Sequence, residues 1–238
     1  FTDCGLKWFL ERTGAKDGDS VAQLLGIAVH ALAALVKKEP DISAAVAIER
    51  LTNSWKIVDQ NIGWYKDAQL EKASKMLDRF FAWNEANPRE LLAVEFKFMV
   101  EIGRAKLNGS VDRIEKDSEG ALHVVDIKTG AGKVTGPEAE KHMQLMAYQL
   151  AVMQGGFEEL DQSRVSGGAE LLMLAEDKKI PKAKTQSVLP PEPIIEIVSA
   201  AGEGMGASTF NAKINKNCRT CGVKSLCPVQ AQGRSVID

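Results

Sequence analysis

The sequence predicts a mixed α/β fold, in which a helical lobe stands in front of a core that combines strands and helices. Helical spacing of apolar residues dominates the chain up to Pro88. The period of the apolar pattern then changes, and three successive segments up to residue 130 read as strands. One more helix and one more strand follow. This order differs from the regular strand–helix alternation of a doubly wound sheet.

The helical lobe is expected to hold a short amphipathic helix and three longer stretches, at 4–12, 20–38, 41–53 and 63–86. Three strands joined by turns follow, at 91–102, 105–116 and 121–130. The stretch DSEG (117–120) is the clearest turn, so the second and third strands should form a hairpin. Beyond it we expect a helix that starts after Pro137, a strand, a polar extended segment or loop, a helix and an irregular tail, at 138–153, 169–176, 177–190, 192–203 and 210–238.

The composition is that of a globular protein with a substantial core, since 45% of the 238 residues are hydrophobic and the formal net charge is −2. Because the chain is not basic overall, nucleic-acid binding would need local positive charge or a partner. No apolar run approaches the roughly 20 residues that cross a bilayer. Phe1–Leu10 contains Asp3 and Lys7 and does not read as a signal peptide, so we expect a cytoplasmic protein. A first residue other than Met suggests a fragment of a longer protein.

Two carboxylates and a lysine stand out at the end of the predicted hairpin, in the stretch ALHVVDIKTG (121–130). Asp126 and Lys128 are two residues apart on a strand and therefore face the same side. In the hairpin, Asp112 of GSVDRI comes close to the position opposite Asp126. Two carboxylates can share Mg²⁺ or Mn²⁺, and an adjacent lysine can orient or deprotonate a water or stabilise charge on a phosphoryl oxygen. The alternative is a surface ion pair between Asp126 and Lys128.

Four further motifs accompany this strand: GIAVH with His30, VEFKF with Glu95, GSVDRI with Asp112, and HMQLMAYQL with Gln144 and Tyr148 one helical turn apart. In order and spacing, the set resembles the PD-(D/E)XK nuclease superfamily, and more closely its RecB-like branch. The resemblance covers about residues 26–150. It implies a restriction-endonuclease-like fold and hydrolysis of DNA phosphodiester bonds with a divalent metal ion.

Carried over by position, the resemblance implies a role for each residue of these motifs. Asp112 and Asp126 would be metal ligands, with the Ile127 carbonyl as a third, and His30 would be an additional ligand or active-site group. Lys128 would be the catalytic lysine, and Gln144 and Tyr148 would position DNA or the lysine. Glu95 would support the metal through water, or would pair with Arg104 or Lys97. His123 and His142 belong to no motif.

The four cysteines predict a second site. Three of them form the compact C-x2-C-x5-C loop of Cys218, Cys221 and Cys227, near the end of the chain. Zn²⁺ and [4Fe–4S] clusters need four ligands, and Cys4 is the one cysteine left. A shared site would therefore clasp the two ends of the chain together. Zn²⁺ and free or oxidised thiols are the alternatives to a cluster.

The one-plus-three arrangement also resembles the iron–sulfur nucleases of the superfamily, which include AddB-type subunits, CRISPR-associated RecB-like exonucleases and nuclease domains fused to UvrD/Rep-type helicases. It implies a [4Fe–4S] cluster, a helicase motor in the same chain, a partner subunit, and exonuclease action on single strands or ends in double-strand-break repair. A stand-alone CRISPR-adaptation or phage-type exonuclease and an inert DNA-binding module of the same fold are the alternatives.

On this basis, residues 1–238 form one nuclease domain, with a helical lobe, a nuclease core and a C-terminal helix and cysteine loop at 1–90, 91–176 and 177–238. Basic residues near the thiols and the catalytic strand are expected to line a DNA path: Lys213, Lys216, Arg219, Lys224, Lys128, Lys133 and Lys141.

Overall fold

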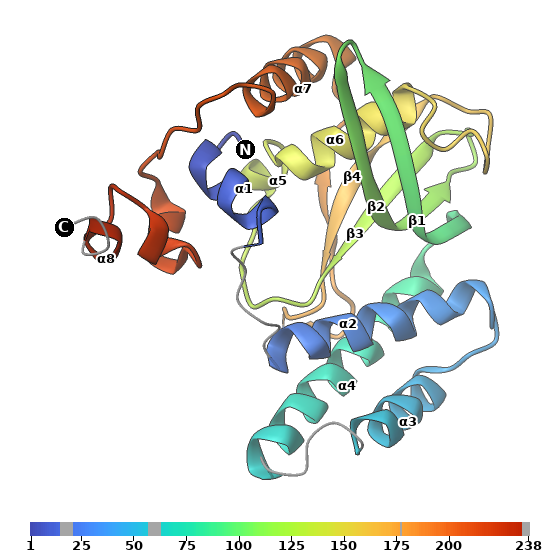
Figure 1. The fold of residues 1–238 in the computed structure, drawn as a ribbon. Helices are drawn as coiled ribbons and strands as arrows, with labels where there is room; N and C mark the ends of the chain where they lie inside the picture. Colours follow the sequence, from blue (N-terminus) through green and yellow to red (C-terminus); the bar gives the residue numbers. More distant parts are fainter. Residues whose placement is uncertain (15–20, 57–62, 177, 235–238) are drawn as a thin grey trace. The chain divides into compact units, whose positions relative to one another are not determined.

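The computed structural model describes residues 1–14, 21–56, 63–176 and 178–234 (Figure 1). Contacts between residues divide the chain into two compact units. We call residues 1–19, 101–106 and 195–238 the terminal unit, and residues 20–100 and 107–194 the core unit. Among the helices within the described ranges, none combines the length and the apolar character that a membrane span requires.

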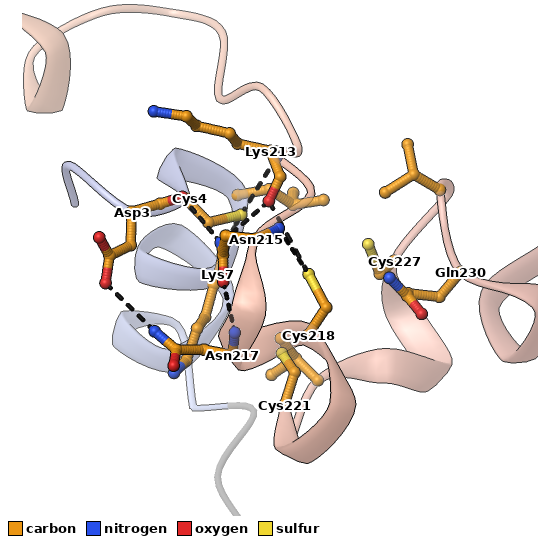
Figure 2. A pocket seen from close by; sticks show the side chains of 13 residues that line it. Asp3, Cys4, Lys7, Lys213, Asn215, Asn217, Cys218, Cys221, Cys227 and Gln230 are labelled. Carbon is orange, nitrogen blue, oxygen red and sulfur yellow. Dashed lines mark hydrogen bonds between the residues drawn. The ribbon is translucent and has the colours of Figure 1, made fainter.

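The terminal unit joins the first and the last residues of the chain. It contains α1 (Gly5–Arg12), most of α7 (Pro191–Met205), two 3-10 turns, η2 (Lys216–Thr220) and η3 (Lys224–Leu226), and α8 (Ala231–Arg234). The Phe9 ring stacks on Phe210, with centroids 4.6 Å apart. Asn215 Nδ2 donates a hydrogen bond of 2.9 Å to the Asp3 carbonyl (Figure 2). These contacts hold segments more than 200 residues apart in one unit.

A mixed sheet of five strands in the order β1-β2-β3-β4-β5 forms the centre of the fold. The strands are β1 (Glu90–Ile102), β2 (Ala105–Lys116), β3 (Leu122–Lys128), β4 (Ser166–Met173) and β5 (Lys184–Gln186). β2 and β3 are antiparallel around the DSEG turn, β3 and β4 are parallel, and β4 and β5 are antiparallel. The predicted mixed α/β class and the hairpin are confirmed. β5 lies in the segment expected to be extended or looped, and three polar residues form it by pairing with Ala169–Leu171.

Two helices lie against one face of the sheet, α2 (Val21–Ala33) and α4 (Gly63–Ala86), and α3 (Ala44–Trp55) packs on these two helices (Figure 1). A 3-10 turn, η1 (Ala34–Lys37), follows α2, and Ser43 caps α3 by accepting a hydrogen bond from the Val46 amide. Val125 and Ile127 of β3 and Leu172 of β4 contribute to the same hydrophobic cluster as these helices. The predicted helical lobe therefore shares one hydrophobic cluster with this face of the sheet.

The opposite face of the sheet packs against α6 (Met143–Met153), where Leu145 and Tyr148 lie among Val124, Leu171 and Phe157. The prediction of one helix over 138–153 was wrong. The structure has a short α5 (Gly136–Ala139), then a break, and His142 is extended (φ −76°, ψ 112°) where it precedes α6.

A tertiary contact accompanies the break. The buried Gln186 side chain of β5 donates through Nε2 to the carbonyls of Ala139, Glu140 and His142, at 3.0, 3.1 and 3.2 Å. A continuous helix would direct its carbonyls to its own amides further along the chain. At the break, the Ala139 and His142 carbonyls also accept the backbone amides of His142 and Met146. Gln186 therefore adds a side-chain donor to both of them and supplies one to the Glu140 carbonyl.

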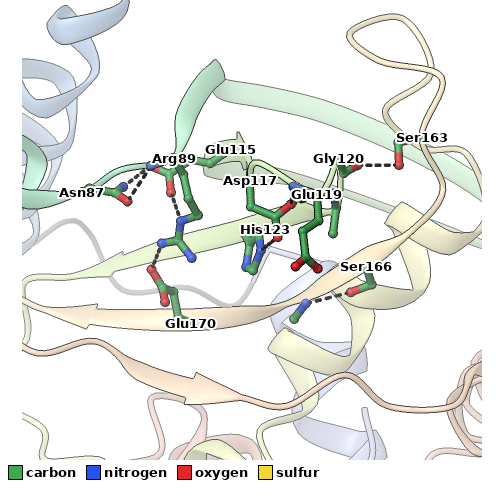
Figure 3. Close-up of polar contacts among 12 residues, drawn as sticks. Asn87, Arg89, Glu115, Asp117, Glu119, Gly120, His123, Ser163, Ser166 and Glu170 are labelled. Atoms are coloured by element: carbon green, nitrogen blue, oxygen red, sulfur yellow. Dashed lines mark hydrogen bonds and ion pairs between the residues drawn. The ribbon is translucent and has the colours of Figure 1, made fainter.

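A buried ion-pair network lies on the sheet within the core unit (Figure 3). Glu115, which is fully buried, accepts hydrogen bonds from Asn87 Nδ2 at 2.8 Å and from Arg89 Nε at 2.7 Å. Arg113 Nε also pairs with Glu115, and Arg89 Nη2 pairs with Glu170. Two arginines and two glutamates thus balance their charges among residues of β2, β4 and the segment between α4 and β1. Nothing in the spacing of these residues indicated that they would meet.

Candidate active site

The active-site candidate forms where β2 and β3 separate. Their ladder ends at the pair Arg113↔Val125, so Asp112 and Asp126 are the next two residues facing each other in register. Asp112 Oδ2 accepts a hydrogen bond of 2.6 Å from the Ile127 amide. In a continuing ladder, the Ile127 amide would donate to a backbone carbonyl of β2. Here the side chain of Asp112 accepts this hydrogen bond instead. This separation places both carboxylates at one opening of the sheet, as the hairpin register predicted.

Three side chains from different elements converge beside this opening: His30 of α2, Glu95 of β1 and Asp112 of β2. One ligand atom from each lies within 4.8 Å of the others, and they are the one such group of metal-binding side chains among the described residues. His30 Nδ1 lies 3.3 Å from Asp112 Oδ1 and 3.9 Å from Glu95 Oε1. Glu95 therefore faces His30, and among the described residues it forms no ion pair with Arg104 or Lys97, the two alternative partners.

Glu95 adopts an unusual backbone conformation, with φ of 47°. Among the described residues other than glycine, it is the one with a positive φ. This left-handed conformation costs roughly 1–3 kcal/mol for such a residue and persists where the surrounding structure enforces it. The strain is located at the group of possible metal ligands, where it directs the Glu95 carboxylate.

The remaining predicted residues form a closed polar ring. Lys128 Nζ lies 2.6 Å from Asp126 Oδ2 and donates to Gln144 Oε1 at 3.0 Å. Gln144 Nε2 donates to the Tyr148 hydroxyl at 2.7 Å, and that hydroxyl donates to Asp126 Oδ1 at 3.1 Å. The ring fixes the orientation of the Gln144 amide, because Lys128 can only donate. Gln144 and Tyr148 thus contact the lysine and the aspartate directly.

The electrostatics show an excess of negative charge. Burial raises the pKa of Asp126, as does the nearby Asp112, although Lys128 opposes the shift. Burial and Asp112 also raise the pKa of Glu95. Burial alone would lower the pKa of His30, but its hydrogen bond to Asp112 and the charges of the three carboxylates raise it overall. A divalent cation would relieve this repulsion, and carboxylate oxygens are the ligands that Mg²⁺ and Mn²⁺ prefer. The residues present therefore fit such an ion.

The structure brings together His30, Glu95, Asp112, Asp126, Lys128, Gln144 and Tyr148, all of them in the core unit. The Ile127 carbonyl, the suggested third ligand, belongs to a residue whose amide faces Asp112. In a strand, the N–H and C=O of one residue point to the same neighbour, so this carbonyl also faces the Asp112 side.

Sequence reasoning missed His142, which directly precedes α6. Burial lowers its pKa, and the charge of Lys128 adds to this effect. Its Nδ1 atom is buried and has no hydrogen-bond partner among the described residues. Its place two residues before Gln144 was the available signal, but an isolated histidine at a helix start has many structural explanations.

Gly26 of α2 was also missed, although it belongs to the same motif as His30. A Cβ at this position would lie 2.9 Å from Thr129 Oγ1, which is closer than such contacts allow. Thr129 directly follows Lys128. The absence of a side chain at Gly26 therefore lets α2 approach the end of β3, and His30 lies one helical turn further along.

Replacing Gly26 with alanine is expected to displace α2 and to weaken Mn²⁺ binding by about 10-fold, as is common when supporting contacts of a metal site are lost. Adding Thr129→Ala removes the clashing oxygen and should restore binding. Calorimetric Mn²⁺ titration of both variants and of Thr129→Ala alone measures this effect. Since alanine favours a helix over glycine by about 1 kcal/mol, a simple loss of helix stability is not expected. Wild-type binding by Gly26→Ala alone would contradict the role of this contact.

The four cysteines lie in the terminal unit and line one pocket (Figure 2). Cys4 precedes α1, and its Sγ accepts the backbone amides of Lys7 and Lys213, each at 3.5 Å. Cys218 Sγ accepts the Asn215 amide at 3.3 Å. Amide donors of this kind stabilise negative charge on sulfur. The sulfur atoms are not gathered as closely as the ligand atoms of His30, Glu95 and Asp112, and Cys227 lies to one side of the other three (Figure 2).

Comparisons with known proteins identify the family of this chain. Over residues 1–228, the sequence matches the family model of the PD-(D/E)XK nuclease superfamily. A search of the curated proteins finds no significant match. Among solved structures, the chain is similar to the one titled "Crystal structure of SSO0001", with 15% identity, 94% of each chain covered and a TM-score of 0.36. The match of the family model extends over nearly the whole chain, and nucleases of this superfamily use divalent metal ions. This chain belongs to the PD-(D/E)XK nuclease superfamily.

Proposed function

We propose that this chain is a metal-dependent deoxyribonuclease of the RecB-like branch, which hydrolyses phosphodiester bonds in single strands or at DNA ends as an exonuclease. The observation that carries the proposal is the meeting of two groups at the β2–β3 opening. His30, Glu95 and Asp112 form a group of possible metal ligands, and Asp126 and Lys128 lie opposite Asp112. A surface ion pair alone would not need the three other ligand side chains.

In this proposal, Asp112 and Asp126 hold Mg²⁺ or Mn²⁺, with His30 and Glu95 completing the site. A bound ion of this kind lowers the pKa of water and neutralises charge on a phosphoryl oxygen. Lys128 is about one-third exposed, so its ammonium can reach both Asp126 and a phosphate at the opening. Its charge orients the attacking water and stabilises the charge that develops on phosphorus-bound oxygen. Gln144 and Tyr148 hold Lys128 and Asp126 in place.

The proposal is tested by incubating the chain with end-labelled single-stranded DNA in Mg²⁺, in Mn²⁺ and in EDTA. Cleavage that requires a divalent ion and that releases label progressively from one end is expected. An internally labelled circular strand separates end-dependent from internal cleavage. Absence of cleavage by folded protein at every metal concentration would favour the inert DNA-binding module.

We further propose that Cys4, Cys218, Cys221 and Cys227 ligate a [4Fe–4S] cluster, with Zn²⁺ as the alternative. The amide donors to Cys4 and Cys218 and the shared pocket support a metal bound by thiolates. The cluster would draw Cys227 toward the others and would tie together the ends of the chain. Its role is structural in this proposal, because hydrolysis transfers no electrons.

Cys221→Ala is expected to lose bound iron and to lower the melting temperature by roughly 5–10 °C, since a ligand that binds only the folded state stabilises it. Protein purified without oxygen should be analysed for iron, zinc and sulfide before melting. Ser225→Ala, an exposed change in the same loop, is the matched control. Zinc in place of iron would establish the alternative. An unchanged melting temperature together with metal-free wild type would refute the clasp.

The chain context is a separate proposal, in which the nuclease works beside a helicase motor and a partner subunit during double-strand-break repair. A stand-alone exonuclease of the CRISPR-adaptation or phage type would have the same chemistry. The exonuclease assay with and without a supplied helicase distinguishes the two, since only the first should degrade duplex DNA faster when a motor is present.

A further inference from the structure

The outer face of the β1–β2 hairpin carries exposed side chains that begin at the active-site candidate. Lys97 and Met99 follow Glu95 at alternate positions of β1, and Ser110 and Asn108 precede Asp112 at alternate positions of β2. All four are exposed, and 61% of Met99 is accessible to solvent. We call these four residues the hairpin track.

The alternation of the two strands explains this arrangement. Phe98 and Val111 point inward, and a Cβ at Gly109 would lie 3.1 Å from the Phe98 ring. On each strand, the neighbours of these inward-facing residues must therefore face outward: Lys97 and Met99 on β1, and Ser110 on β2. Same-face side chains on a strand recur about every 7 Å. The track thus leads away from Glu95 and Asp112 in two such steps on each strand.

The chemistry of the track suits a single nucleic-acid strand. Within the described residues, Lys97 forms no ion pair, so its charge is available to a phosphate. Asn108 and Ser110 add side-chain hydrogen-bond donors, although the Ser110 hydroxyl also reaches the Phe96 carbonyl at 3.4 Å. Met99 offers an apolar, adaptable surface to a base or sugar. Single-strand grooves combine cations that follow the phosphates with aromatic side chains that stack on bases. In the track, Lys97 supplies the cation, and Met99 supplies an apolar contact surface in place of an aromatic ring.

We propose that single-stranded DNA lies along the hairpin track, with the phosphates next to the cleaved bond at Lys97 and a base or sugar at Met99. This proposal rests on the proposed nuclease function and names the path of its substrate. Continuity with the metal-ligand group selects DNA as the occupant. A protein partner on the same face is the competing outcome, and it would leave DNA affinity unchanged.

The test measures how the affinity for a fluorescent oligothymidine depends on salt, by anisotropy, in a Lys128→Ala background so that the DNA is not consumed. Each phosphate contact to a single strand contributes about 0.7 to the slope of log K against log salt. Lys97→Ala is therefore expected to reduce the slope by about 0.7 and the affinity at low salt by about fivefold. Lys97→Arg should restore both, and Met99→Ala should lower affinity without changing the slope.

Lys75→Ala is the matched control, because it removes the same charge from α4, where Lys75 pairs with Glu71 at 2.7 Å. Equal slopes for Lys97→Ala, Lys75→Ala and their Lys128→Ala parent would contradict the proposal that DNA lies along the hairpin track. This result is distinct from failure of the proposed function, which is absence of cleavage by the wild type. A reduced slope for Lys97→Ala, together with no cleavage by the wild type, would support the DNA path along the hairpin track and would contradict the proposed nuclease function.

Discussion

Lys128→Ala is expected to reduce cleavage of single-stranded DNA by about 10²–10⁴-fold, the range that a positioned proton-transfer or charge-stabilising group contributes. The structure gives the reason. The ammonium of Lys128 lies 2.6 Å from Asp126 Oδ2 and is held by Gln144 from α6. A lysine at this position brings a compact positive charge within reach of both the Asp126 carboxylate and the Gln144 side chain. The measurement is the initial rate of cleavage under saturating Mg²⁺ or Mn²⁺.

Lys133→Ala is the matched control for this prediction, since Lys133 is an exposed lysine five residues further along the chain. It removes the same charge from the segment that follows β3, and Lys133 is not a member of the ring. Melting curves should show both variants folded. If the two variants lose the same small amount of activity, Lys128 acts only through the general field of positive charge. The assignment of the catalytic strand would then be wrong.

Tyr148 offers a graded check on the same ring. Its hydroxyl accepts from Gln144 and donates to Asp126, and burial next to Asp126 raises its pKa, so it stays protonated. If the ring only positions Lys128 and Asp126, removal of the Tyr148 hydroxyl should lower the cleavage rate much less than removal of the Lys128 ammonium. Activity lost to the same extent would show that the hydroxyl takes a direct part in the reaction.

Glu115→Ala is expected to lower the free energy of unfolding by about 3–5 kcal/mol, the usual cost of removing one partner from a buried ion pair. Arg89 and Arg113 would remain buried on the sheet with their main acceptor gone. Arg113 also lies over the Trp83 ring, 5.3 Å from its centroid, so it cannot turn outward without unpacking α4. The measurement is urea unfolding, supported by a fall in melting temperature of roughly 10 °C.

Glu71→Ala is the control for that loss of stability. It removes a glutamate from an exposed ion pair with Lys75, and such pairs contribute about 0–1 kcal/mol. The two variants delete the same side chain, so the difference between them reports burial. Equal stabilities would mean that water enters the network and satisfies the arginines.

Much of the core could be predicted from the sequence because the relevant signals are local. The change of period and the run of apolar and β-branched residues located β1, β2 and β3, and the DSEG turn set the hairpin. Counting outward from that turn placed Asp112 close to the position opposite Asp126, and the observed register, in which Arg113 pairs with Val125, makes the two residues direct neighbours. The i, i+4 spacing placed Gln144 and Tyr148 on one face of α6.

Other features depend on contacts between distant segments. β5 is a strand because β4 supplies its hydrogen bonds, and the Gln186 side chain of β5 binds the carbonyls at the break between α5 and α6. The positive φ of Glu95 and the fit of Gly26 against Thr129 also depend on neighbours far away in the chain. Local periodicity carries no information on such contacts.

The sequence by itself therefore determined the class of fold, the hairpin and the identity of the residues at its open end, because residue type and spacing act over a few positions. The tertiary structure alone decided that His30 and Glu95 meet Asp112, that Gln144 and Tyr148 hold Lys128 and Asp126, and that Glu115 gathers two arginines. Side chains from separate elements meet only when the helices and the sheet pack. Their distances then follow from the fit of the whole core, down to a missing Cβ at Gly26.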